Sequence, residues 1–207
     1  MARRHDLVGL TVLALLTVRE SHPYDLHRMI VSTHKDYVTG LPRSLYHAVE
    51  RLTRDGLTEP AETVRDGRRP ERTVYRITEQ GRAELAGRLR TLLEQPDPDR
   101  RTFVAAVSLL GCLPRRDARQ SLAVRAATLT GSVTGLAAQL DALRESGLPD
   151  VLLLELEYER AAQQAELDWV RSVLSRLDSG ELDWSGTLRS DLLEGVLTEN
   201  TDTGRNP

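Results

Sequence analysis

The hydrophobic pattern of the first part of the chain predicts a series of short helices. Residues Leu7–Leu16 are apolar on nearly every side, so we expect a buried first helix. Ser21 is a candidate N-cap for a second helix over Tyr24–Val31. A third helix begins after Pro42 and ends at Gly56, and its core face is formed by residues at i, i+3, i+4 and i+7: Leu45, Ala48, Val49 and Leu52.

A β-hairpin and a fourth helix follow. The segments Leu57–Val64 and Thr73–Ile77 favour strands, and an Asp-Gly pair between them favours a turn. The fourth helix is expected from near Thr78 to about Leu93, before the breaker Gln95-Pro96-Asp97-Pro98. This order of elements predicts a winged helix-turn-helix domain over residues 1–95.

The second part of the chain predicts a helical domain over residues 96–197, which makes the fold mostly α. A short helix over Phe103–Leu113 precedes a long one that starts at Pro114. Apolar residues follow the long helix with the 3-4 spacing of a coiled-coil seam, and we assign dimer contacts to Leu122, Leu129, Val133, Leu136, Leu140 and Leu143.

After Gly147-Leu148-Pro149 the chain is expected to reverse into a second long helix over Val151–Leu177, packed antiparallel on the first. Its inner face is predicted to contain Leu154, Tyr158, Ala161, Ala165, Trp169, Val173 and Leu177. A last short helix is expected over Ser185–Leu197, and residues 198–207 are expected to form a flexible tail.

Composition narrows the class of protein. The 207 residues include 28 basic and 31 acidic side chains and are 40% hydrophobic, as in ordinary globular proteins. Residues 1–95 carry 16 basic and 13 acidic side chains, whereas residues 96–207 carry 12 and 18, so the two parts differ in sign. A single cysteine, Cys112, excludes an intrachain disulfide and favours the cytoplasm. The apolar runs are too short for a membrane span.

The outer face of the third helix is the first candidate site. At about 100° per residue, its side chains opposite the core face include two arginines, Arg43 and Arg54. In a helix-turn-helix the first residues of the recognition helix reach base edges in the major groove. We therefore assign base contacts to Arg43, Ser44 and His47.

The flanks of the same helix carry Tyr46 and Arg51, which are placed to donate hydrogen bonds to phosphates. Glu50 is unusual beside phosphates. It either accepts a hydrogen bond from a cytosine amino group or neutralises Arg54 at i+4.

The predicted turn of the hairpin is rich in arginine. Four arginines lie within eight residues beside Gly67, and such a cationic tip suits phosphates or a minor groove: Arg65, Arg68, Arg69 and Arg72. Together with the preceding helices, this tip favours double-stranded DNA as a partner.

No catalytic or metal-binding constellation is recognised in the sequence. The five histidines lack metal-ligand spacing and no glycine-rich phosphate loop follows a strand, so we expect neither an enzyme nor a cofactor. Cys112 lies in an apolar stretch and is interpreted as a small buried thiol. Trp169 and Trp184 either stack on a planar small-molecule effector or anchor packing in the helical domain.

The motifs of the N-terminal part resemble the PadR-like transcriptional regulators. His22-Pro23-Tyr24-Asp25-Leu26 is similar to the opening of that family's second helix, and Ser44-Leu45-Tyr46 to its recognition helix. The segment from Gly67 to Arg82 is similar to its wing and its Thr-x-x-Gly helix start. The resemblance covers about residues 7–93.

The resemblance implies a homodimer, joined by its helical domain, that binds a palindromic operator, usually as a repressor released by a small molecule. The two recognition helices would lie roughly 34 Å apart, one turn of DNA. Pro23, Arg43 and His47 depart from the family pattern, so base preference does not transfer. An alternative stays open, in which the chain is a helical dimerisation or adaptor protein whose partner is another protein.

Overall fold

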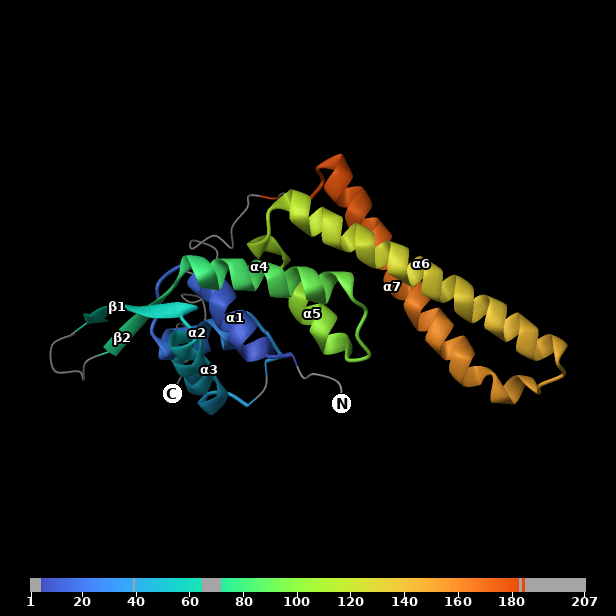
Figure 1. Ribbon diagram of the computed structural model, residues 1–207, viewed down its shortest axis with the longest axis horizontal. Coiled ribbons are helices and arrows are strands. Elements are labelled where there is room, and N and C mark those ends of the chain that lie inside the picture. The colour runs from blue at the N-terminus through green and yellow to red at the C-terminus, as the bar shows by residue number, and fades with distance from the viewer. Residues whose placement is uncertain (1–4, 39, 65–71, 183, 185–207) are drawn as a thin grey trace, which may run out of the picture.

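The computed structural model describes residues 5–38, 40–64, 72–182 and 184, and it shows a winged-helix part and a helical part (Figure 1). The first contains α1 (Leu7–Leu16), α2 (Pro23–Ser32), α3 (Arg43–Arg54), β1 (Thr58–Val64), β2 (Arg72–Ile77) and α4 (Glu79–Glu94). The second contains α5 (Arg100–Ser108), α6 (Arg115–Glu145) and α7 (Leu154–Ser179), with 3-10 turns at Leu110–Cys112 and Asp150–Leu152. The predicted fold class is confirmed.

The two parts extend in opposite directions. The β1–β2 hairpin projects from one end of the molecule, and the antiparallel pair α6 and α7 forms a long arm at the other (Figure 1). Within the described residues, every helix falls short of the length and apolar character that a membrane span requires. The predicted helix over 185–197 and the tail over 198–207 lie outside the described residues.

Helix α1 is the centre of the winged-helix part. It begins where the Asp6 carboxylate accepts a hydrogen bond from the Gly9 amide at 3.0 Å, and eight of its ten residues are buried. Because the helix is apolar on nearly every side, α3 and α4 both pack against it. The predicted buried first helix is therefore confirmed.

Helix α2 is capped by a different residue from the one predicted. His22 is the N-cap, and its Nδ1 accepts a hydrogen bond from the Tyr24 amide at 3.1 Å. Burial lowers the pKa of His22, which favours the neutral ring that accepts this bond. The predicted cap, Ser21, is instead extended and pairs through its backbone with Tyr75 at 3.0 Å in both directions. This bridge joins the start of α2 to the hairpin.

The hairpin is held against the start of α4 by a threonine and a glycine. Thr78 Oγ1 accepts from the Gly81 amide at 3.0 Å and donates to the Gly56 carbonyl at 2.8 Å. A Cβ on Gly81 would lie 2.0 Å from the Leu57 carbonyl oxygen, so a larger residue cannot approach the strand this closely. The Thr-x-x-Gly pattern thus sets the position of β1 and β2 relative to α4.

The apolar seam of α6 is partly filled within the single chain. Leu122, Leu129 and Leu140 are at most 2% exposed in the single chain, because α6 packs against α7 and α4. The other predicted dimer residues, Val133, Leu136 and Leu143, are half-buried. The three buried leucines therefore have no surface left for a partner, and the dimer contact assigned to this seam stays a prediction.

The inner face of α7 differs from the predicted one. Its buried residues are Leu167, Val170, Val173 and Leu177, whereas Leu154 and Tyr158 are 56% and 73% exposed. Most residues of the predicted set are four positions apart. Four residues turn a helix by about 400°, which is about 40° more than one full turn, so the set drifts around the helix. Side chains at its start therefore cannot share a face with Val173 and Leu177 at its end.

A buried arginine joins the arm to the winged-helix part. Arg125 of α6 is 1% exposed, and its Nη1 donates at 3.2–3.3 Å to carbonyl oxygens at the end of α4, those of Leu92, Leu93 and Gln95. Its Nε donates to Glu166 Oε1 of α7 at 2.6 Å, and its guanidinium lies 3.7 Å from the centre of the Phe103 ring of α5. We call this cluster the Arg125 joint.

Removing the Arg125 side chain is expected to destabilise the whole chain. Arg125→Ala leaves the Glu166 carboxylate and the end of α4 without their donor, at an expected cost of about 3–5 kcal/mol of unfolding free energy. Urea denaturation measures this loss. Arg119→Ala on the same helix is the control, because the Arg119–Asp178 ion pair is about half exposed and its loss is expected to shift the midpoint far less. Equal shifts for the two variants contradict the role of the joint.

Candidate nucleic-acid interface

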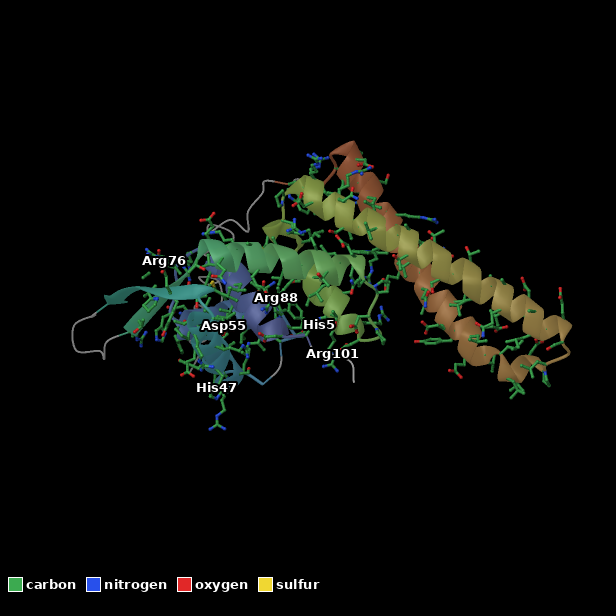
Figure 2. All side chains as sticks on the ribbon, in the orientation of Figure 1. His5, His47, Asp55, Arg76, Arg88 and Arg101 are labelled. Atoms are coloured by element: carbon green, nitrogen blue, oxygen red, sulfur yellow. The ribbon has the colours of Figure 1, made fainter. Side chains whose placement is uncertain are left out.

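Helix α3 is sharply divided between a buried and an exposed face. Leu45, Ala48, Val49 and Leu52 are at most 1% exposed and pack into the winged-helix core. The opposite face exposes polar side chains, with His47 pointing away from the rest of the molecule (Figure 2): Arg43, Tyr46, His47, Glu50 and Arg54. The predicted orientation of the helix is confirmed, and it leaves this face open to a large partner.

The first turn of α3 is electropositive. Among the described residues, no side-chain hydrogen bond caps its N-terminus at Pro42. No acidic residue lies in its first turn, where Arg43 is exposed. Cations are unfavourable at a helix N-terminus, because its amide groups already carry partial positive charge. The same charge attracts phosphates and other anions. An arginine at this position therefore costs stability in the free protein and favours an anionic partner.

The other predicted residues of the recognition helix differ in surroundings. Tyr46 is 42% exposed, and Ser44 is half-buried with its amide bonded to the Gly40 carbonyl at 3.3 Å. His47 Nδ1 lies 3.6 Å from Glu50 Oε2, and both side chains are about two-thirds exposed. Glu50 thus lies beside His47 on its own helix, and its pairing with Arg54 stays a prediction.

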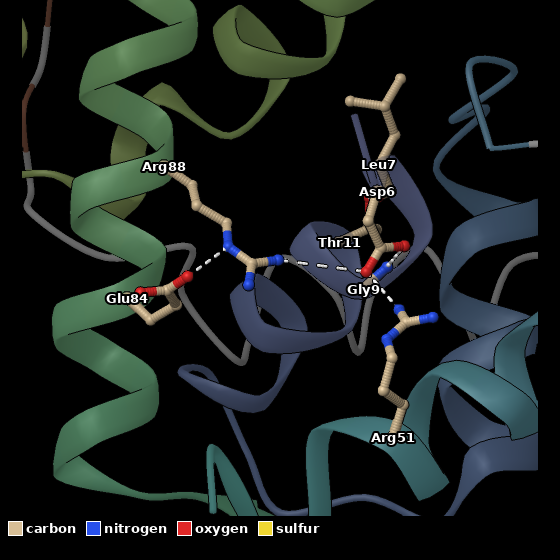
Figure 3. A network of polar contacts seen from close by, with 7 residues as sticks. All are labelled: Asp6, Leu7, Gly9, Thr11, Arg51, Glu84 and Arg88. Carbon is tan, nitrogen blue, oxygen red and sulfur yellow. Dashed lines mark hydrogen bonds and ion pairs between the residues drawn. The ribbon is translucent and has the colours of Figure 1, made fainter. Parts of the chain in front are cut away.

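Arg51 is engaged inside the protein. Its guanidinium forms an ion pair with the Asp6 carboxylate at the start of α1 (Figure 3). The phosphate contact assigned to Arg51 from the sequence stays a prediction. To make it, the guanidinium would have to exchange the Asp6 carboxylate for a phosphate.

The described part of the wing contributes one of its four predicted arginines. Arg72 is exposed at the start of β2, and its guanidinium lies 6.0 Å from the centre of the Tyr24 ring of α2. Tyr24 is itself 50% exposed, so α2 and the hairpin present a shared cationic and aromatic surface. Residues Arg65, Arg68 and Arg69 lie outside the described residues. Sequence reasoning missed the Tyr24–Arg72 contact, because it depends on the position of the hairpin over α2.

The two tryptophans have separate environments. Trp169 is 43% exposed and meets the Phe103 ring edge-on, with 5.8 Å between ring centres. Trp184 is half-buried, and its Nε1 donates to the Leu113 carbonyl at 3.1 Å. The two rings thus have different partners, Phe103 and the Leu113 carbonyl, and the effector role assigned to them stays a prediction.

The structure holds no metal-binding group within its described residues: no three histidine, cysteine, aspartate or glutamate side chains come together there. Cys112 is half-buried beside the core, as its apolar surroundings suggested.

Comparison with known proteins identifies the winged-helix part. Its residues 12–87 match the profile of the Transcriptional regulator PadR-like family. Residues 12–87 belong to the PadR-like family. This is a family of DNA-binding transcriptional regulators and not of enzymes. A search of curated proteins finds no match.

Solved structures similar to the chain include three structures of two PadR-like proteins. Bacillus subtilis PadR in complex with operator DNA is 19% identical, with a TM-score of 0.42, covering 84% of this chain and 99% of that chain. A PadR-like transcriptional regulator from Bacillus cereus is 18% identical, with a TM-score of 0.36 and coverage of 86% and 99%. Bacillus subtilis PadR in complex with p-coumaric acid is 17% identical, with a TM-score of 0.37 and coverage of 83% and 99%.

The Cys112 thiol is expected to react slowly. Burial raises its pKa to about 11, so little of the reactive thiolate forms near neutral pH. At pH 8 we expect an aromatic disulfide reagent to modify the folded protein at least about tenfold more slowly than the chain unfolded in urea. The rate should rise with pH. Equal rates in the two states contradict the buried, protonated thiol.

Proposed function

We propose that the chain is a homodimeric, sequence-specific DNA-binding regulator that acts in the cytoplasm and represses transcription from a palindromic operator. One observation carries the proposal. The outer face of α3 exposes Arg43, Tyr46 and His47 on a helix whose other face is fully buried, within a PadR-like domain. A helix anchored in this way can enter a major groove without losing its packing.

The residues of this face have different roles in the proposal. Arg43, in the first turn, forks onto a guanine, and His47 one turn later reads a neighbouring base. Tyr46 donates to a phosphate on the flank. Arg72, which lies beside Tyr24, contacts a phosphate of the adjacent DNA backbone and so positions the hairpin on the DNA. Base contacts supply specificity, and phosphate contacts supply affinity and register.

The proposed dimer uses exposed apolar side chains of the arm. At its tip, four large residues are 56–73% exposed: Val151, Leu152, Leu154 and Tyr158. Near its root, Val124 and Trp169 of the arm and Val104 of the neighbouring α5 are 39–54% exposed. Clustered exposed apolar residues are typical of interfaces, and a two-fold axis pairs each patch with one on the partner. We therefore propose two arms side by side, the tip of each against the root of the other.

The proposed effector is a small planar molecule that stacks on Trp169 and releases the operator. The Trp169 ring is partly exposed, touches Phe103, and through it the Arg125 guanidinium. A molecule bound there would press on the residues that join the arm to α4. It would thereby change the spacing of the two recognition helices in the dimer.

Replacing Arg43 tests the DNA interface. The probe is a duplex recovered from a random-sequence library by repeated selection with the wild-type protein, measured by fluorescence anisotropy at two salt concentrations. Loss of a bidentate arginine–guanine contact costs about 1–3 kcal/mol, so Arg43→Ala should weaken binding roughly five- to a hundredfold and relax base preference at one position. Arg101→Ala, on the exposed surface of α5, is the control and should bind as wild type does.

Two results contradict the proposal. Wild-type binding that is absent or insensitive to salt at micromolar protein favours the alternative, an adaptor whose partner is another protein. Salt-sensitive binding that Arg43→Ala leaves unchanged means that another face contacts the DNA.

Charges at the tip of the arm test the dimer. The double variant Leu152→Asp, Tyr158→Asp puts two carboxylates into the proposed interface and should weaken dimerisation at least about tenfold. Sedimentation velocity measures the change. Since both side chains are exposed in the single chain, helicity and the midpoint of thermal unfolding at low concentration should stay as in wild type. A dimer of unchanged affinity refutes this arrangement of the arms.

A further inference from the structure

The Asp6 carboxylate connects three helices of the winged-helix part (Figure 3). Its Oδ1 caps α1 by accepting from the Gly9 amide at 3.0 Å. Its Oδ2 forms the ion pair with Arg51 of α3 and lies 4.0 Å from Nη1 of Arg88 of α4. One side chain thus touches the central helix, the recognition helix and the helix that leads to the arm.

The local sequence is suited to this contact. A Cβ on Gly9 would lie 2.2 Å from Asp6 Oδ2 and 3.2 Å from Arg51 Nη2. A side chain at residue 9 would therefore displace the carboxylate from the guanidinium. The polar cluster also includes Glu84 of α4, whose Oε1 accepts a hydrogen bond from Arg88 Nε at 2.7 Å.

Arg51 has two competing uses. It lies on the flank of the recognition helix, where a free guanidinium would contact any DNA backbone regardless of sequence. Bound to Asp6, it instead ties the last turns of α3 to α1. The carboxylate is one-third exposed and the guanidinium 44% exposed, so the pair is near the surface and a phosphate could compete for the arginine.

We propose that Asp6 is a positioning residue for DNA recognition: through Arg51 it fixes α3 on α1 and α4, and it withholds one positive charge from the DNA backbone. The proposal rests on the proposed function. Its consequence is selectivity, because the same contact that orients the base-reading residues also limits sequence-independent binding.

The variant Asp6→Asn tests this directly. Asparagine caps helices about as well as aspartate, so α1 should persist while the ion pair is lost. With the selected duplex and a random-sequence duplex as probes, we expect the ratio of the two affinities to fall about fivefold. For the random duplex, the slope of log affinity against log salt should steepen by about 0.9, the value for one added phosphate contact.

Glu84→Gln is the matched control. It removes the same unit of charge from the same polar cluster, but the partner of Glu84 is Arg88 on its own helix, α4, and not a residue of α3. We expect its affinity ratio to stay within about twofold of wild type and its salt slope to be unchanged. If Asp6→Asn and Glu84→Gln behave alike, net charge explains both and the proposal is overturned.

Arg51→Gln separates positioning from phosphate contact. Positioning predicts a lower affinity ratio with an unchanged salt slope, because the wild-type arginine neutralises Asp6 and not DNA. A slope that becomes shallower by about 0.9 means that Arg51 binds phosphate in the wild type and overturns the proposal. Wild-type protein that binds neither duplex overturns the proposed function itself, so the two failures are distinguishable.

Discussion

The arrangement of this protein depends on one buried cation. Arg125 is almost completely removed from water, and a guanidinium in that position is tolerated when it is hydrogen-bonded and paired with a carboxylate. Its partners come from α4, α5 and α7, so the cost of burying the charge is offset where the winged-helix part meets the arm. The proposed dimer, which would read two half-sites, needs a fixed angle at this place, because a flexible joint would vary the distance between the recognition helices.

A second charged contact positions the recognition helix, as Arg125 positions the arm. Asp6 and Arg51 hold α3 on α1, and Thr78 with Gly81 holds the hairpin on α4. The two candidate DNA-contacting elements are therefore positioned by short polar contacts around an apolar centre. Apolar packing buries the elements, whereas these directional contacts set where their exposed residues point.

Sequence reasoning succeeded where the signal is local and failed where it depends on distant residues. Helical spacing predicted the buried face of α3. Gly56 predicted where the helix ends, and its φ of 73° is one that glycine adopts readily. Ser21 is a better cap than His22 by preference, but its backbone is used by Tyr75, 54 positions later. The apolar stripe predicted along α6 is present, but the spacing of its residues does not distinguish packing against α7 from packing against a partner. Arg125 looks like any other arginine until its neighbours are known.

Hydrogen exchange measured by mass spectrometry, with and without the selected duplex, tests the central claim that α3 and the hairpin form the DNA-contacting surface. The account predicts slower exchange on DNA binding in residues 40–54 and 72–77, with the middle of the arm, residues 126–145, unchanged. Slower exchange confined to the arm, or absent from α3 in a protein that binds the duplex, contradicts it.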